Sequence, residues 1–240
     1  MLKFFALFCA ASLLSAPVFA QTVELDFEAD ETDTLEYPGY SGSTTGIEAT
    51  PTGEPTDVEA YTGTQAYEGH FTWTTISNDQ TQALVRITDA GGGRHVLTET
   101  TSTDRIGLWI KYDGAAGPMK LAMVVREATH GTYEGTTWTE LSGSTEWQHF
   151  YWGFTDDIVD DTDASDEGDM NWGQTVGGGG QSYNGDGSLD TSGGQDIELE
   201  AVLLRPIEGS TTSGTEVVLF IDHIYTGAPE VTSTQDWELY

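Results

Sequence analysis

Basic residues are scarce in this chain of 240 residues. Lys and Arg number 8 against 40 Asp and Glu, which gives a formal net charge of −32. Such a charge disfavours binding to nucleic acid or to an anionic membrane, so we expect neither as a partner. We interpret the excess of acidic residues as a halophilic feature. In 1 M salt the Debye length is about 3 Å, so the repulsion between the many carboxylates is screened. Against this background, the positions of the few bases become informative.

Cysteine is nearly absent too, since Cys9 is the only one and lies in a segment that we expect to be removed. Lys3 precedes an apolar run over 4–14, and small residues at Val18 and Ala20 are typical of a signal-peptidase site. Residues 1–20 therefore predict a signal peptide, cleaved near Ala20, and a secreted protein. Without further cysteine, disulfides are excluded and the fold must depend on core burial.

Long hydrophobic runs and Ala- or Leu-rich helical stretches are missing after residue 20, so we expect no membrane insertion and few helices. What the chain has instead is alternation of apolar and polar residues at period two. Eight segments show it: 23–28, 67–76, 83–88, 106–112, 119–127, 147–154, 197–205 and 217–225. Gly, Asp and Pro separate them. This pattern predicts an all-β fold, an antiparallel β-sandwich.

Two regions interrupt the alternation. Residues 29–62 are rich in Thr, Gly and Pro and predict a long loop with one short strand. Residues 155–196 hold eight acids and no base over 156–169, then nine glycines over 173–194. Such a stretch buries too little apolar surface to fold alone. We therefore expect one domain over 21–228 with an insertion at about 155–196, followed by a tail over 229–240.

Five motifs occur in order along the chain. They are Leu25-Asp26-Phe27-Glu28, 62–67 (TGTQAY), 106–111 (IGLWIK), 146–150 (EWQHF) and 220–225 (FIDHIY). Together they resemble carbohydrate-binding modules with the galactose-binding-like jelly-roll fold. The resemblance implies a jelly-roll sandwich and a non-catalytic secreted module that binds a polysaccharide or oligosaccharide. It also implies that Trp147 packs in the core.

The same resemblance implies a structural calcium ion between the first and last strands. Its ligands would be the carboxylates of Glu28 and Asp222, joined by loop carbonyls near Gly63. Calcium coordinates several oxygen atoms at about 2.3–2.6 Å, which strand-end carboxylates and carbonyls can supply. The alternative is that Glu28 and Asp222 are solvated strand residues.

Aromatic residues are the candidates for sugar contact, because pyranose rings pack on Trp and Tyr. Tyr133 and Trp138 lie in a stretch, 132–143, that reads as a loop, and Trp172 lies in the insertion. We expect these three side chains to be exposed.

The alternation of side chains along the predicted strands adds basic residues to the candidate ligand-binding residues. Arg105, Trp109 and Lys111 share one face of their strand, and Arg126 lies on the polar face of the next. If they converge, they would suit an anionic polysaccharide, because Arg binds carboxylates bidentately. The alternative is that these bases pair with neighbouring acids and hold the strands in register. The predicted ligand-binding residues are Trp109, Lys111, Arg126, Tyr133, Trp138 and Trp172.

Two other functions stay open. The chain has neither an H-E-x-x-H nor a G-x-S-x-G motif. However, His149 and Tyr151 on one strand face, with Arg126, would suit a β-sandwich polysaccharide lyase acting on uronate polymers. Residues 236–240 (DWELY) resemble the lead-in to a bacterial sorting domain, which favours a structural or adhesive surface domain.

Overall fold

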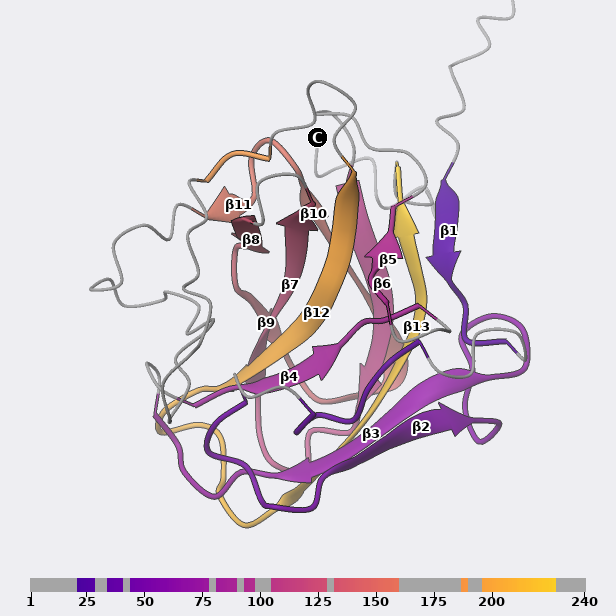
Figure 1. The fold of residues 1–240 in the computed structure, drawn as a ribbon. Helices are drawn as coiled ribbons and strands as arrows, with labels where there is room; N and C mark the ends of the chain where they lie inside the picture. The colour runs from indigo at the N-terminus through magenta and orange to yellow at the C-terminus, as the bar shows by residue number, and fades with distance from the viewer. Residues whose placement is uncertain are drawn as a thin grey trace, which may run out of the picture.

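The computed structural model describes residues 21–28, 34–40, 44–77, 81–89, 93–97, 105–128, 132–159, 187–189 and 196–227. Within these ranges every regular element is a β-strand, and there is no helix long and apolar enough to cross a membrane. The strands form two antiparallel sheets that pack face to face (Figure 1). The predicted antiparallel β-sandwich is confirmed.

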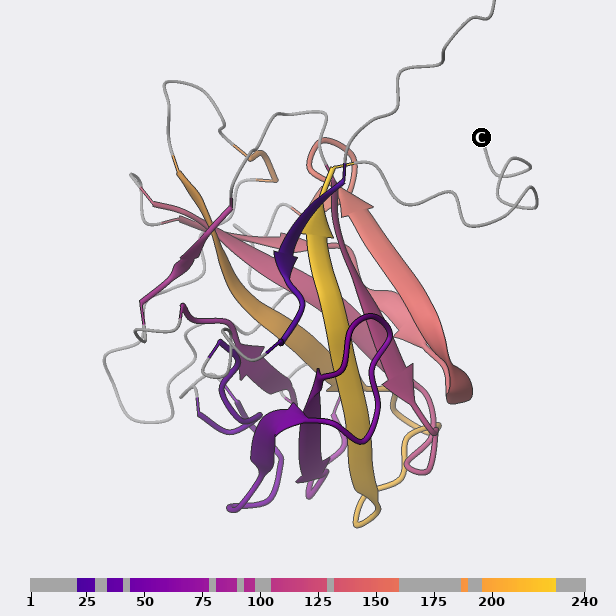
Figure 2. The same ribbon diagram turned by 90° about the vertical axis from the view of Figure 1, so that its right-hand side faces the viewer.

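The first sheet has the strand order β10-β6-β13-β3-β2, and β1 also pairs with β13. Figure 2 shows β13 in yellow between β1 in indigo and the β6–β10 pair. The bounds are β1 (Thr22–Leu25), β2 (Thr52–Thr56), β3 (Ala66–Thr72), β6 (Arg105–Tyr112), β10 (Ser144–Gly153) and β13 (Glu216–Thr226).

The second sheet has the order β11-β8-β7-β12-β4, with β5 on β12 and β9 on β7. Its strands are β4 (Ala83–Arg86), β5 (His95–Val96), β7 (Met119–Glu127), β8 (Thr132–Thr136), β9 (Thr139–Leu141), β11 (Ile158–Val159) and β12 (Ile197–Pro206).

The core lies between the sheets and is built by alternate residues of each strand. On β6, Ile106, Leu108, Ile110 and Tyr112 are fully buried and point inward. The opposite parity points to solvent, as expected for a sheet with one buried face. Every one of the eight predicted segments contains a strand, because this alternation is what the core requires.

One prediction of local structure was wrong. Residues 132–143 contain β8 and β9 rather than a loop. The sequence shows no alternation of apolar and polar residues here, because most residues of β8 are polar or glycine although the strand pairs with β7. Glu134 lies opposite Val125, and the hydroxyl of Thr136 accepts a hydrogen bond from the backbone N–H of Met123. Trp172, residues 1–20, the tail over 229–240 and most of the proposed insertion lie outside the described residues.

Among the register shifts between paired strands, those in β12 and β13 change the direction of side chains that matter for the outer faces. In β12 the pairing with β7 shifts between Leu199 and Ala201, so Glu200 is an extra residue. In β13 the pairing with β6 shifts between Asp222 and Tyr225, and His223 has a positive φ of 51°. A bulge places two consecutive residues on one side of a strand and reverses the parity beyond it.

The segment 61–65 is fastened to the first sheet by two carboxylates. Asp222 accepts hydrogen bonds from the backbone N–H groups of Tyr61 and Thr62, at 2.7 and 2.9 Å. Glu28 accepts from the backbone N–H and the hydroxyl of Thr64. These donors also hold the pKa of Glu28 below its usual value. Asp222, which pairs with Trp109 on the outer side of the sheet, and Glu28 thus hold this loop over the outer face of the first sheet.

Gly63 offers a test of this anchor, because its φ is +61° and a Cβ there would overlap Glu28. We expect Gly63→Ala to lower the free energy of unfolding by about 2–4 kcal/mol, from the left-handed conformation and the lost hydrogen bonds together. Gly209→Ala is the control, since its φ is +78° and nothing lies within 4 Å. It should cost about 1 kcal/mol. Equal costs in denaturant unfolding would show that Glu28 does not hold the loop.

Candidate functional site

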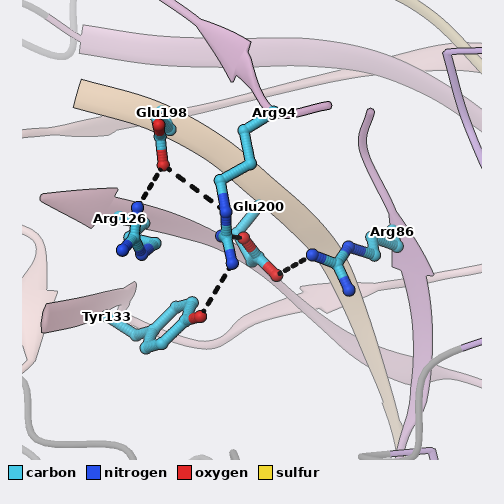
Figure 3. A network of polar contacts seen from close by, with 6 residues as sticks. All are labelled: Arg86, Arg94, Arg126, Tyr133, Glu198 and Glu200. Carbon is cyan, nitrogen blue, oxygen red and sulfur yellow. Dashed lines mark hydrogen bonds and ion pairs between the residues drawn. The ribbon is translucent and has the colours of Figure 1, made fainter. Parts of the chain in front are cut away.

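Arginine and glutamate side chains form a connected network on the outer face of the second sheet (Figure 3). Glu200 is held by Arg86, at 3.3 Å, and by Arg94. Glu198 is held by Arg126, at 2.6 Å, and by Arg94, at 3.7 Å. Three guanidinium groups therefore share two carboxylates. Alternation along β12 already places Glu198 and Glu200 on one face. The bulge at Glu200 reverses the parity beyond it, so that Ala201, Leu203 and Arg205 lie on this face too.

Aromatic rings lie among these charges. Arg94 donates a hydrogen bond to the hydroxyl of Tyr133 at 3.0 Å. Arg94 and Arg126 both lie over the Tyr133 ring, at 5.6 and 5.8 Å from its centroid. Arg205 lies over the half-buried ring of Trp138 at 4.6 Å. Such cation–π contacts hold the guanidinium planes in fixed orientations.

Beneath the charges is a small apolar layer. Leu84, Ala122, Val124, Ala201 and Leu203 are fully buried there, and Trp138 packs against them. Lys120 lies opposite Arg205 in the β7–β12 pairing and shares its side of the sheet. We call this surface the arginine face; its charged and aromatic members are Arg86, Arg94, Lys120, Arg126, Tyr133, Trp138, Glu198, Glu200 and Arg205.

The arginine face gathers five of the seven basic residues that follow residue 20, of which Arg205 is only 1% exposed. The side chains of Arg86, Arg94 and Arg126 are 29%, 26% and 20% exposed, whereas that of Glu200 is 2% exposed. The acids of the network are thus more deeply placed than the bases. At this network, solvent therefore contacts the guanidinium groups of Arg86, Arg94 and Arg126 more than the carboxylates.

The outer face of the first sheet is different, because aromatic rings dominate it. Tyr61 stacks on Trp109 at 3.9 Å between centroids, and His149 stacks on Trp109 at 4.6 Å. Trp147 contacts Tyr61, and Tyr151 contacts His149. We call these five residues the aromatic face. Arg105 lies over Tyr151 at 5.1 Å, and Lys111 pairs with Glu59 at 2.8 Å.

The predicted ligand residues therefore fall on two faces rather than one. Arg126, Tyr133 and Trp138 come together on the arginine face, while Trp109 and Lys111 lie on the opposite side of the sandwich. Arg105 and Lys111 share the face of Trp109, but the expected convergence of Arg126 with Trp109 was wrong, because β6 and β7 belong to different sheets. Tyr133, expected to be exposed, is 3% exposed. Both explanations of the bases hold in part. Several bases cluster on one face, and most of the bases are also paired with neighbouring acids.

Trp147 also differs from its expectation. The resemblance implied a core position, but the side chain is half-buried on the outer face beside Tyr61. Its parity agrees with that of His149 and Tyr151, and Trp152 is the tryptophan of β10 that is buried in the core. Here strand parity was the better guide.

The three residues proposed for a lyase are not assembled. His149 and Tyr151 lie on the first sheet and Arg126 on the second. The Nε2 atom of His149 lies 2.6 Å from the hydroxyl of Tyr225, which is buried. His149 therefore packs as one of the stacked rings of the aromatic face.

The two predicted calcium ligands both hold the 61–65 segment. Asp222 receives N–H donors from Tyr61, Thr62 and His223, and Glu28 receives them from Thr64 and Gln65. In the part of the chain that the structure describes, there is no group of three His, Cys, Asp or Glu residues suited to a metal. N–H donors rather than carbonyl oxygens face these carboxylates. A calcium ion at this point stays a prediction.

Sequence reasoning missed much of the arginine face. Arg94, Glu198 and Glu200 are central to it, yet no motif marks them. The available signal was the alternating pair Glu198 and Glu200 in a chain with few arginines. Which arginines meet this pair depends on the pairing of β12 with distant strands, which the local sequence does not show.

No protein-family model matches the chain, and no curated protein matches its sequence. Solved structures do show a similar fold. One is a family 11 carbohydrate-binding module from a cellulosomal cellulase of Clostridium thermocellum. It is 12% identical with a TM-score of 0.47, over 89% of this chain and 98% of that one.

Two further structures show the range. A structure described for carbohydrate-binding modules of the β-sandwich superfamily is 10% identical with a TM-score of 0.46. The match covers 85% of this chain and 61% of that one. An exo-β-agarase is 12% identical with a TM-score of 0.43, over 90% of this chain but 26% of the enzyme. At these identities and TM-scores the likeness concerns the overall fold alone and carries no argument about function.

Burial raises the pKa of Asp222 to about 6, against the opposing effect of its N–H donors. The folded state therefore binds the proton of the Asp222 carboxyl group more tightly than the unfolded state does. The contribution of Asp222 to the free energy of unfolding consequently falls as pH rises from about 4 to 6. We expect Asp222→Asn to remove this part of the pH profile, so that the wild type loses stability relative to the variant over that interval. Melting temperatures at pH 4–7 measure it.

The exposed Glu146, changed to Gln, is the control and should leave the profile parallel to wild type. A difference between wild type and Asp222→Asn that stays constant across pH 4–7 would contradict the assignment.

Proposed function

We propose that the chain is a secreted, non-catalytic module that binds a polysaccharide bearing carboxylate or sulfate groups at the arginine face. One observation carries the proposal: on a protein with 40 acids, five of the seven bases that follow residue 20 gather on one face, with Trp138 among them. Clustered bases next to an aromatic ring match the two parts of an acidic sugar, its anion and its apolar ring face.

The geometry favours binding in contact over long-range attraction. A guanidinium group carries five N–H donors, and here three such groups share two carboxylates among the described residues. Donors thus remain for an anionic ligand at the 20–29% of each side chain that is exposed. In concentrated salt, attraction beyond a few ångströms is screened, whereas bidentate hydrogen bonds at contact persist better.

The network also lowers the entropic cost of binding. Glu198 and Glu200 hold the three guanidinium groups from below, and Tyr133 orients two of them. Binding then does not have to immobilise long flexible side chains, which costs about 0.5–1.5 kcal/mol for each one. The acids of the face therefore act as supports for the bases.

Arg94 is the residue to change, because it contacts both carboxylates and Tyr133. We expect Arg94→Ala to weaken binding of oligogalacturonate or a sulfated galactan oligosaccharide about 10- to 100-fold, as for the loss of charged hydrogen bonds. Arg94→Lys should recover only a part, because the forked geometry is lost. Titration calorimetry in high salt measures the affinity.

Ser213→Glu, in the exposed β12–β13 connection, is the matched control, since it changes the net charge by the same one unit. It should bind like wild type. Equal affinity of Arg94→Ala and Ser213→Glu, with both folded, would refute the arginine face as the site. Release of unsaturated uronide product would instead support the lyase.

Calcium remains part of the proposal through the resemblance alone. Its check is the melting temperature of the protein with calcium and with a chelator, repeated in Glu28→Gln. A shift that Glu28→Gln abolishes supports the site, and equal melting temperatures contradict it.

A further inference from the structure

Arg94 reaches the arginine face from the start of a very short strand. β5 consists of His95 and Val96, which pair with Leu199 and Glu198 of β12, and Arg94 comes directly before it. A ladder of two residues supplies few backbone hydrogen bonds, so its local stability is low unless side chains add to it. The place of Arg94 therefore depends on what its neighbours contact.

Consecutive residues of this segment point to opposite sides of the second sheet. Arg94 lies on the outer side, where its guanidinium group joins the network of the arginine face. His95 lies opposite Leu199, which belongs to the core between the sheets, so the imidazole points inward. A change at His95 thus alters the support of Arg94 without touching the arginine face itself.

His95 meets the first sheet through a buried carboxylate. Its Nε2 atom lies 3.4 Å from Oε2 of Glu24, which belongs to β1. The Oε1 atom of Glu24 accepts a hydrogen bond from the hydroxyl of Thr226 in β13, at 2.7 Å. The side chain of Glu24 is 1% exposed and that of His95 is 18% exposed. Because an ionised carboxylate only accepts hydrogen bonds, Nε2 of His95 is the donor, and water competes little with this contact.

The far end of the segment is held in the core. Leu97 is 5% exposed, and its backbone N–H donates to the carbonyl of Ile197 at 2.8 Å. We infer that His95 is a positioning residue for Arg94: by contact with Glu24 it joins β5 to the first sheet and holds the strand that brings Arg94 to the arginine face. The inference deepens the proposed function, and it rests on that function where it concerns ligand affinity.

The test compares His95→Phe, which keeps a ring but has no donor for Glu24, with His95→Gln, whose amide N–H can replace the donor. In His95→Phe we expect the backbone N–H of Leu97 to exchange with deuterium about tenfold faster, from the lost hydrogen bond. The buried N–H of Met123 in β7 should exchange at the wild-type rate. Affinity for oligogalacturonate or a sulfated galactan oligosaccharide should fall about 3- to 10-fold, because binding must then order Arg94. His95→Gln should recover a part of both losses.

His70→Phe is the matched control. His70 also lies against carboxylates, those of Glu68 at 2.9 Å and Glu216 at 3.2 Å, but on β3 of the first sheet. This variant should leave both the exchange of Leu97 and the affinity at their wild-type values.

Wild-type exchange of Leu97 in His95→Phe would overturn the inference, as would undiminished affinity despite faster exchange. An equal rise in the exchange of Leu97 and Met123 would overturn it too, because His95 would then support the whole fold. So would the absence of any recovery in His95→Gln. If the wild type bound no anionic oligosaccharide, the proposed function would fail, and the exchange of Leu97 in the two His95 variants would still decide whether His95 holds the strand.

Discussion

Two extra residues in the strands, one in β12 and one in β13, decide what each face of the sandwich presents. Before Glu200, the inward residues of β12 are Ile197 and Leu199; after it they are Val202 and Leu204. Without the bulge, Arg205 would point into the core, where an unpaired charge costs several kcal/mol. The bulge in β13 follows Asp222, which alternation already turns outward. It places Ile224 in the core and Tyr225 on the outer side, beside His149.

Because bases are few in this chain, the place of each one in the fold is informative. In a chain with five acids for each base, a guanidinium group can pair almost anywhere, yet those of Arg86, Arg94 and Arg126 meet on one face and share two carboxylates there. The partial burial of Glu198 and Glu200 strengthens their pairs with arginine relative to pairs in open solvent. The network is therefore more than a set of surface salt bridges, because removing Glu198 or Glu200 would take from Arg126 or Arg86 the carboxylate with which it pairs.

The sequence predicts the strands well, because burial between two sheets imposes a period of two that survives in the residues. It predicts the faces less well. Parity correctly groups Trp147, His149 and Tyr151, but it cannot reveal that Arg126 and Trp109 lie on different sheets. Nor can it show the phase change at Glu200. These depend on pairing between distant strands, such as β12 with β5 and β7, and no local pattern encodes that pairing.

The two outer faces differ in the physical interaction that each offers, and the core separates them. Sheets in a sandwich lie about 10 Å apart, so contacts on one face and on the other should contribute independently. Screening by salt weakens charge attraction but leaves ring stacking nearly unchanged. An increase in salt should therefore weaken ligand binding at the arginine face, with Arg94 at its centre, more than it weakens the stacking that holds Trp109 between Tyr61 and His149 on the aromatic face.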